Sequence, residues 1–376
     1  MDNALLGGLS PAEFLSSYWQ KKPLLIRRAI PEFRNLLDTK ALFQLAGRED
    51  CESRLIKRQG KQWALEHGPF LEKELRRLPA SAWTILLQGL NTVLPTADEL
   101  MRRFKFIPYA RLDDLMVSYA VKQGGVGPHV DSYDVFLLQG EGRRRWRIST
   151  QSDLELVPGA PLKILRNFRP EHEWVLEAGD MLYLPPNVAH EGTALDECMT
   201  YSIGFRAPSA QELGEQFLSF LQENLALPGM YADPGLRVQK EPAHVADAYI
   251  DQVEKMLKAI RWRRADIEAF AGQYLSEPKA HIQFEPPVRS LNRTAFARAM
   301  KSQGIRLALP SILLHRSAAF YINGERCEAP PPCRPLLRRL ANERRLPSGS
   351  AVPNELTALL HGWYQAGYLR LGASDG

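Results

Sequence analysis

The sequence predicts a mixed α and β protein whose central part is a double-stranded β-helix, the architecture also known as a jelly roll. Between about residues 105 and 206, short β-rich runs alternate with glycine and proline. After Pro208, apolar residues recur at helical spacing, and the last hundred or so residues form a basic module of helices and short strands. Because 376 residues exceed what one hydrophobic core usually serves, we expect three domains, over residues 1–207, 208–275 and 276–376.

The composition is that of an ordinary globular protein, which we expect to stay in the cytoplasm. No apolar run reaches the length of about 18 residues that a membrane span needs, and the N-terminus lacks a secretory signal, so no membrane partner is expected. The net charge of +5 suits an enzyme that visits nucleic acid or a ribonucleoprotein, and it leaves direct nucleic-acid binding open. Four scattered cysteines without a Cys-x-x-Cys spacing are interpreted as reduced thiols: Cys51, Cys198, Cys327 and Cys333.

The N-terminal hundred residues are interpreted as scaffold. Ser10 can cap a helix that has Pro11 at its first position and Glu13 at its third. A strand is expected to start in Lys22–Ile26. Residues from about 31 to 104 mix helices with short strands and carry no chemical constellation.

The jelly roll is predicted from a series of short apolar runs. Turns such as Gln139–Gly142 separate them, and a barrel of this size can hold one small ligand. The predicted strands are Leu115–Val121, Tyr133–Leu138, Trp146–Ile148, Trp174–Leu176, Met181–Leu184 and Met199–Phe205.

Two helical stretches follow the jelly roll. Ser209 and Glu212 form a capping box that opens the first, and the second covers about residues 243–274. These helices have little to pack on except each other or another subunit, so we predict a helical dimerisation module; the alternative is a helical cap within one chain. The remaining helices and strands predict a winged-helix-like α+β domain. They are Thr294–Ser302, Ala319–Gly324, Leu337–Leu340, Leu356–Leu360 and Gly367–Leu371.

The chemistry is predicted from a His-x-Asp pair and a distant histidine. On a strand, His129 and Asp131 would present an imidazole and a carboxylate on one face. A short apolar strand that ends at a Pro-Pro turn delivers His190 as the third ligand. Two imidazoles and one carboxylate are the ligand set of non-haem Fe(II) oxygenases, which leaves three coordination positions open. The triad therefore predicts a metal site with oxidation chemistry.

Arg144 is the predicted anchor of a co-substrate. It shares a strand face with Trp146, whereas Arg143 and Arg145 share the other face. A guanidinium aimed into a barrel is costly unless it meets an anion, and a dicarboxylate that chelates iron supplies one. A β-bulge would reverse this parity, which keeps Arg143 and Arg145 as weaker alternatives.

Two further residues complete the predicted site. Ser118 lies in an apolar strand that leads toward the metal, where it can donate to the same carboxylate; alternatively, its hydroxyl is satisfied by backbone. Tyr133 would lie on the same strand face as His129 and Asp131 and is predicted to line the entrance for the substrate; alternatively, it is a core residue.

Three motifs together closely resemble the JmjC-type ribosomal oxygenases, in particular the bacterial members that hydroxylate an arginine β-carbon in large-subunit ribosomal protein sixteen. They are Gly127-Pro128-His129-x-Asp131-x-Tyr133-Asp134, Gln139-Gly140-x-Gly142-Arg143-Arg144-Arg145-Trp146, and Gly179-Asp180-x-Leu182-Tyr183-Leu184-Pro185-Pro186 leading to His190. The likeness extends over nearly the whole chain.

The resemblance implies a JmjC (cupin) catalytic domain over residues 1–207. It implies Fe(II) held by His129, Asp131 and His190, and 2-oxoglutarate anchored by Arg144 with help from Ser118. It further implies a ribosomal protein as substrate, 3-hydroxylation of an arginine, and homodimers formed through the helical segment.

Other functions stay open at this point. Another metal-dependent cupin enzyme would usually need an extra imidazole or glutamate ligand near His129, and it would not release succinate from 2-oxoglutarate. A related branch of the family hydroxylates histidine. A non-catalytic nucleic-acid-binding protein would keep a salt-sensitive affinity for RNA or DNA after replacement of His129 and Asp131.

Overall fold

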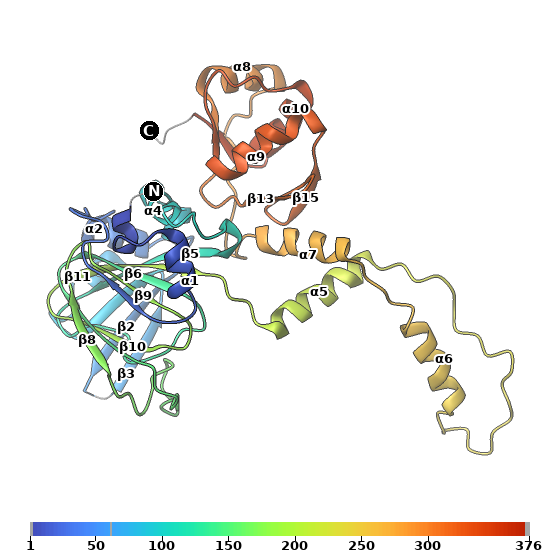
Figure 1. Ribbon diagram of the computed structural model, residues 1–376, viewed down its shortest axis with the longest axis horizontal. Helices are drawn as coiled ribbons and strands as arrows, with labels where there is room; N and C mark the ends of the chain where they lie inside the picture. Colours follow the sequence, from blue (N-terminus) through green and yellow to red (C-terminus); the bar gives the residue numbers. More distant parts are fainter. Residues whose placement is uncertain (1–2, 61, 373–376) are drawn as a thin grey trace. The chain divides into compact units, whose positions relative to one another are not determined.

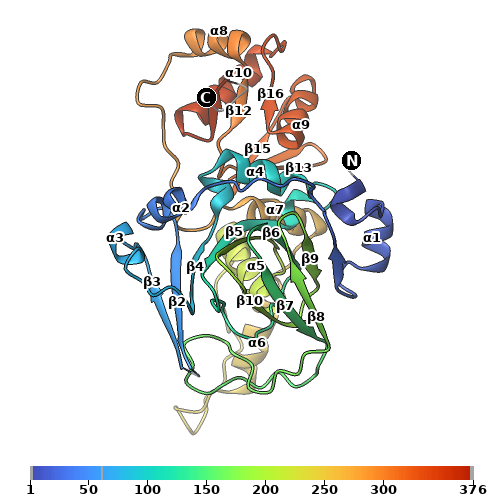
Figure 2. The same ribbon diagram turned by 90° about the vertical axis from the view of Figure 1, so that its left-hand side faces the viewer.

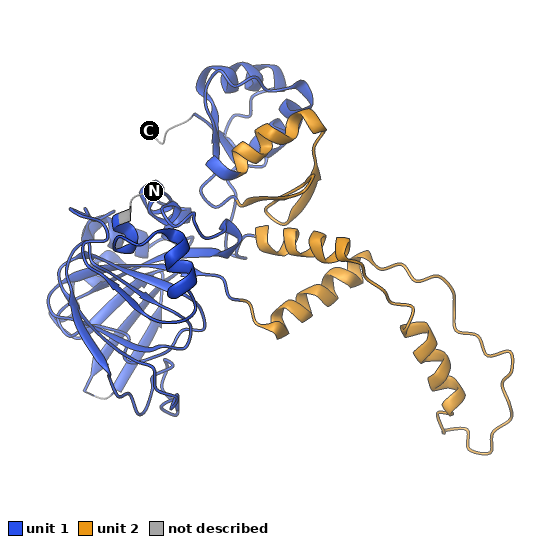
Figure 3. Ribbon diagram, in the orientation of Figure 1, with its two compact units in different colours: residues 1–207, 278–311, 342–376 blue, residues 208–277, 312–341 orange. Residues whose placement is uncertain are grey.

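A computed structural model describes residues 3–60 and 62–372 of the chain. Its residues fall into two compact units (Figure 3). Unit 1 comprises Met1–Ala207, Pro278–Ser311 and Asn342–Gly376, and unit 2 comprises Pro208–Glu277 and Ile312–Ala341.

Figures 1 and 2 label many of the regular elements. The α-helices are α1 (Pro11–Ser17), α2 (Thr39–Ala46), α3 (Glu72–Leu75), α4 (Pro95–Arg102), α5 (Ala210–Asn224), α6 (Asp247–Leu257), α7 (Arg264–Ser276), α8 (Arg293–Gln303), α9 (Arg334–Glu343) and α10 (Asn354–Gln365). The strands are β1 (Leu24–Ile26), β2 (Ser53–Gln59), β3 (Gln62–His67), β4 (Trp83–Leu87), β5 (Leu112–Ala120), β6 (Val135–Glu141), β7 (Arg144–Ser149), β8 (His172–Leu176), β9 (Met181–Leu184), β10 (Ala189–Ala194), β11 (Cys198–Phe205), β12 (Ile305–Leu307), β13 (Leu313–Arg316), β14 (Ala319–Ile322), β15 (Glu325–Glu328), β16 (Arg345–Leu346) and β17 (Leu369–Leu371).

Two antiparallel sheets form the predicted jelly roll (Figure 2). The larger has the strand order β1-β9-β6-β11-β5-β4-β2-β3, and the smaller has the order β10-β7-β8. Val135 and Leu137 of the larger sheet pack in one apolar cluster with Trp146 and Ile148 of the smaller sheet. The two sheets therefore face each other across an interior that this cluster fills in part.

The outer face of the larger sheet carries the main hydrophobic core. Successive side chains of a strand point to opposite faces, so Phe136 and Leu138 of β6 enter this core whereas Val135 and Leu137 face the other sheet. Phe14 of α1 is fully buried there, with its ring centroid 4.9 Å from that of Tyr183. The helices thus seal one face of the sheet and leave the interior between the sheets for the site.

The structure confirms the predicted helix starts. The side chain of Ser10 accepts a hydrogen bond from the Glu13 amide, and Glu13 accepts one from the Ser10 amide. Ser209 caps α5 by accepting from the amide of Glu212, which is one half of the predicted capping box; the Glu212 side chain accepts from the Tyr274 hydroxyl instead.

Two local predictions were wrong. The stretch 243–274 is not one helix, because α6 ends at Leu257 and α7 begins only at Arg264. His129 and Asp131 do not lie in a regular strand: His129 forms an isolated β-bridge with His190, and Asp131 is in irregular chain. Hydrophobic periodicity and residue type do not reveal such interruptions, which depend on tertiary hydrogen bonds.

The C-terminal region contains two small antiparallel sheets. In unit 1, β16, β12 and β17 form a three-stranded sheet, and β17 contacts both α8 and α10. In unit 2, the sheet β13-β14-β15 packs against α7. Among the described residues, no helix combines the length and the apolar character needed to cross a membrane.

The buried carboxylate of Asp134 provides a test of the jelly-roll core. It accepts hydrogen bonds from the Tyr183 hydroxyl at 2.7 Å and from the side-chain amide of Gln20 at 2.9 Å. Asp134→Ala leaves these donors unpaired, so we expect the free energy of unfolding to fall by about 3 kcal/mol, measured by urea denaturation. Asp196→Ala, which removes an exposed partner of Arg143, should cost less than about 1 kcal/mol. Equal losses would contradict the expectation.

Candidate metal and co-substrate site

His129 and His190 are held opposite each other by their own backbones. The amide of each residue donates to the carbonyl of the other, at 2.9 Å and 2.8 Å. Their ring centroids lie 4.2 Å apart. Gly127, which precedes His129, has a φ of +78°, and a Cβ there would lie 2.7 Å from Ile164 and 2.9 Å from Trp63. Glycine is therefore required for the approach of this segment.

Asp131 joins the two histidines through the turn that delivers His190. Its carbonyl accepts a hydrogen bond from the amide of Asn187 at 2.8 Å. One carboxylate oxygen, Oδ2, lies 3.6 Å from Nε2 of His190. The structure thus brings together the three predicted ligand residues, and one ligand atom from each lies within 4.8 Å of the others.

The hydrogen bonds of the two imidazoles leave the same nitrogen of each ring available. Nδ1 of His129 lies 2.9 Å from the carbonyl oxygen of Gly127, and Nδ1 of His190 lies 2.9 Å from that of Val188. Since a carbonyl only accepts, each Nδ1 carries the proton and donates, and each Nε2 keeps its lone pair. Burial, together with the nearby His129, lowers the pKa of His190 to about 4, so the imidazole of His190 is neutral near pH 7.

This donor set fits a divalent first-row metal. Two imidazoles and a carboxylate lie close together, in the combination found at non-haem Fe(II) centres with open positions. The backbone carbonyls at Nδ1 supply the outer hydrogen bonds that orient metal-binding histidines. The arrangement can therefore hold an ion while leaving room for a chelating co-substrate.

Arg144 is a buried cation whose donors are only partly satisfied. The residue is 5% exposed, and its Nη1 donates to the Ser118 hydroxyl at 3.0 Å. Its Nε and Nη2 are buried and have no hydrogen-bond partner among the described residues. Because a buried guanidinium with open donors is costly, this geometry fits the carboxylate of a bound co-substrate.

The neighbours of Arg144 follow the predicted alternation. Arg144 and Trp146 are buried on β7, whereas Arg143 reaches the surface and pairs with Asp196. The Ser118 hydroxyl accepts a hydrogen bond from Arg144 and donates to the backbone carbonyl of Thr200 at 3.5 Å, which is the second of its two alternatives; donation to a co-substrate carboxylate stays a prediction. Ser118 thereby orients the guanidinium.

Tyr133 lies at an acidic edge of the interior. The residue is 39% exposed, which argues against the alternative that it is simply a core residue. A Cβ built on Gly204 would lie 3.9 Å from the Tyr133 ring and 3.4 Å from the Asp114 carboxylate, so both groups face this glycine.

Asp114 is a site residue that the sequence reasoning missed. It lies on β5 four residues before Ser118, and the two side chains share the face that points between the sheets. Asp114 is 5% exposed, and its carboxylate accepts from the Gln88 side chain and the Gly89 amide. Burial raises the pKa of Asp114, while Lys279, 3.5 Å away, opposes that rise. The sequence did contain a sign of this: an acidic residue stands at a position of an apolar strand whose side chain is expected to be buried.

Comparisons with known proteins agree with this geometry. Residues 99–213 match the JmjC domain, and residues 259–370 match the ROXA-like winged helix. The chain is 32% identical over 362 residues to the ribosomal protein uL16 3-hydroxylase of Escherichia coli, which covers 95% of this chain and 96% of that protein. A probable ribosomal oxygenase of Haemophilus influenzae is 34% identical over 275 residues, covering 72% of this chain and 68% of its own length.

The fold is also similar to solved structures. YcfD, a ribosomal oxygenase from Escherichia coli in complex with cobalt and 2-oxoglutarate, superimposes with a TM-score of 0.82 at 31% identity, covering 96% of this chain and 98% of that one. Both the predicted jelly roll and the predicted winged helix are confirmed by these matches. Because the Escherichia coli sequence and the Escherichia coli structure align over 95% and 96% of its length, the chain belongs to the JmjC-domain ribosomal oxygenases.

Proposed function

We propose that the chain is an Fe(II)- and 2-oxoglutarate-dependent dioxygenase that hydroxylates ribosomal protein uL16, at C3 of an arginine side chain. The observation that carries the proposal is the triad itself: one ligand atom from each of His129, Asp131 and His190 lies within 4.8 Å of the others, and a backbone carbonyl accepts from Nδ1 of each imidazole. The relative whose alignment covers 95% of the chain, at 32% identity, is named a uL16 3-hydroxylase, which supports the same substrate.

Each site residue has a proposed role. His129, Asp131 and His190 would hold Fe(II), and Arg144, oriented by Ser118, would bind the distal carboxylate of 2-oxoglutarate. The bound metal and co-substrate together supply the oxidising power for C–H hydroxylation, with succinate and carbon dioxide as co-products. The chain itself orients the co-substrate and holds the target carbon near the metal.

The carboxylate of Asp114 supports the proposal that the hydroxylated residue is an arginine. A buried carboxylate that already neighbours a lysine ammonium favours a cationic side chain at this edge of the interior. Tyr133 faces the same glycine and would pack against the aliphatic part of the target side chain. A guanidinium could then donate to Asp114 in place of Lys279.

The proposed reaction is tested with isolated uL16. The protein is incubated with the enzyme, Fe(II), 2-oxoglutarate and oxygen, and tandem mass spectrometry locates any added oxygen while succinate release is counted. One oxygen on an arginine, with succinate formed in proportion, is the expected result. Oxygen on a histidine would move the chain to the histidine-hydroxylating branch, and turnover without 2-oxoglutarate would indicate a different cupin enzyme.

Asp114→Asn is expected to weaken recognition of the target while sparing the oxidation machinery. For a uL16 peptide we expect KM to rise about thirtyfold, since a charge-assisted hydrogen bond is lost, with uncoupled 2-oxoglutarate turnover unchanged. A peptide with citrulline in place of the arginine should bind both enzymes weakly and alike. Asp196→Asn, which changes the surface partner of Arg143, serves as the control. An equal loss for both peptides would contradict the assigned role.

We further propose three domains with the limits 1–207, 208–275 and 276–376, a homodimer formed through the middle one, and a cytoplasmic location beside the ribosomal substrate. The dimer is supported by α6, in which no residue is buried within the chain. Large apolar side chains stay exposed along α5, α6 and α7: Leu213, Leu218, Tyr249, Ile250, Leu257 and Ile267.

Ile250→Glu on α6 is expected to disrupt the dimer. A carboxylate in an apolar interface is costly, so we expect association to weaken by about two orders of magnitude. Sedimentation velocity should then report a species of 42.5 kDa, the mass of one chain, in place of one with twice that mass. Gln252→Glu adds the same charge two residues away on another face of the helix and should leave the dimer intact. A monomeric unmodified chain would contradict the proposed dimer.

A further inference from the structure

Three arginines form one row across the small sheet β16-β12-β17. In the register of this sheet, Arg306 of β12 stands opposite Arg345 of β16 on one side and opposite Arg370 of β17 on the other. Directly opposed residues of antiparallel strands project from the same face. The row therefore places three guanidinium groups side by side on adjacent strands, which lie about 4.8 Å apart.

The opposite face of the same sheet is apolar. Ile305, Leu307, Leu346 and Leu369 are all at most 3% exposed and alternate with the arginines along the strands. Like charges opposed on neighbouring strands destabilise a sheet. Burial lowers the pKa of Arg306, and the like charge of Arg370, which stands opposite it in the sheet, lowers that pKa as well. An external anion would relieve this repulsion.

The positive charge belongs to the C-terminal region as a whole. Residues 276–376 contain 14 Lys and Arg against 7 Asp and Glu, a net charge of +7 in a chain whose total is +5. Twelve of those fourteen are arginine. Helix α10 contains neither lysine nor arginine, whereas α8, α9 and the sheet β16-β12-β17 all carry arginines.

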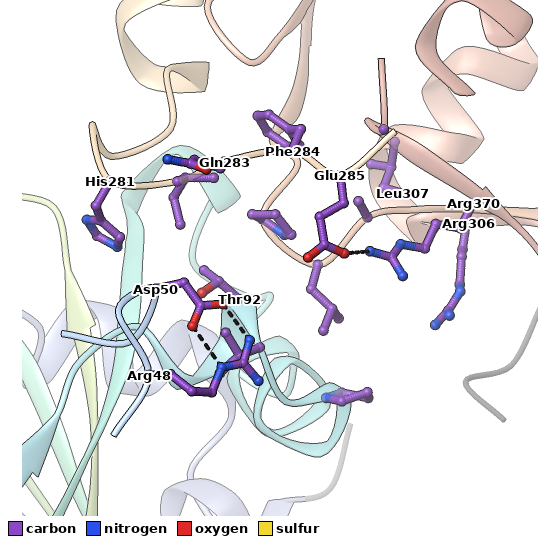
Figure 4. A pocket seen from close by; sticks show the side chains of 17 residues that line it. Arg48, Asp50, Thr92, His281, Gln283, Phe284, Glu285, Arg306, Leu307 and Arg370 are labelled. Atoms are coloured by element: carbon purple, nitrogen blue, oxygen red, sulfur yellow. Dashed lines mark hydrogen bonds and ion pairs between the residues drawn. The ribbon is translucent and has the colours of Figure 1, made fainter. Parts of the chain in front are cut away.

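The row borders an open cavity within unit 1. Arg306, Arg370 and Glu285 lie together on its wall, and its volume is about 470 Å³ (Figure 4). Glu285 is one acidic neighbour of the row, 3.3 Å from Arg370, and its side chain is 78% exposed. An exposed pair of this kind contributes little stability, so a stronger anion can displace the glutamate.

We propose that the row Arg345–Arg306–Arg370 binds the phosphodiester backbone of a nucleic acid strand. Arginine presents a planar fork of donors that matches phosphate oxygens in bidentate geometry, and a lysine point charge does not. Guanidinium groups on adjacent strands suit a ligand whose anionic groups follow one another in a line. The phosphates of a nucleic acid backbone are arranged in this way. This surface does not involve the metal triad, so binding should require neither iron nor 2-oxoglutarate.

The test measures binding of the full chain to a labelled 20-nucleotide RNA strand and to DNA of the same sequence by fluorescence anisotropy. We expect the double variant Arg345→Ser and Arg370→Ser to bind about tenfold more weakly at moderate salt. The slope of log Kd against log salt should fall by about 1.4, from about 0.7 per lost phosphate contact on a single strand. Glu285→Gln should strengthen binding about threefold, an effect that a folding defect would not produce.

The matched control removes two exposed arginines of the same region outside the row, Arg293→Ser and Arg298→Ser on α8. Binding of RNA, of DNA or of both that depends on the row and not on the control pair supports the proposal. Equal losses in the two double variants would overturn it, because the affinity would then reflect total charge. Competition by poly-glutamate as effective as that by nucleic acid would also overturn it, and would indicate an acidic protein partner.

Discussion

His190→Ala is expected to lower succinate formation and uL16 hydroxylation on the order of 10³-fold or more, because a metal with only two protein ligands is neither retained nor positioned. The remaining site would also lose the carbonyl-oriented imidazole that faces Asp131. Calorimetric titration with Co(II) or Mn(II), independent of turnover, should show a matching loss of metal affinity.

His172→Ala is the matched control for this variant. His172 lies outside the triad, on β8, where its ring stacks on Trp174 at 5.5 Å. Its replacement should leave metal affinity and turnover within a factor of about two. If His190→Ala retained full metal affinity, the three side chains would not be the ligands and the proposed function would fail with them.

Arg144→Gln is expected to weaken 2-oxoglutarate binding by about 30- to 150-fold, which corresponds to about 2–3 kcal/mol for a charge-assisted bidentate contact. Glutamine keeps a polar end group but lacks the positive charge and the fork of donors, so the variant removes the contact that Arg144 would make with a carboxylate. Equilibrium titration of 2-oxoglutarate with Mn(II) present measures this effect, and metal affinity measured separately should stay unchanged.

Two further variants separate charge from geometry. Arg144→Lys keeps the charge but lacks the planar fork, so we expect it to recover only part of the lost affinity. Arg143→Gln removes a neighbouring arginine that pairs with Asp196 at the surface, and it should have almost no effect. Equal loss of metal and 2-oxoglutarate affinity in Arg144→Gln would contradict the anchor role.

Local sequence was sufficient wherever the deciding interaction is itself local. The capping box at Ser10 and the N-cap at Ser209 close within four residues, and the apolar run Met181–Leu184 coincides with β9. On β7, alternation alone distinguished buried Arg144 from exposed Arg143, since side chains of a strand point to opposite faces in turn.

Other features depend on residues that are distant in the chain. His129 is in an isolated bridge and not in a strand because its backbone pairs with His190, which no local pattern reveals. The break between α6 and α7 interrupts a stretch whose apolar spacing continues, and Asp114 resembled an ordinary acidic residue until β5 was placed against β4 and β11.

By itself, the sequence determined the types of residue available for chemistry and the faces on which they lie, because covalent order and strand or helix periodicity set both. It was enough to select His129, Asp131, His190 and Arg144. Only the tertiary structure decided which nitrogen of each imidazole stays free, which buried donors of Arg144 await an anion, and which arginines stand opposed on β12. These properties arise from hydrogen bonds and strand registers between segments far apart in the chain, and they exist only once those segments meet.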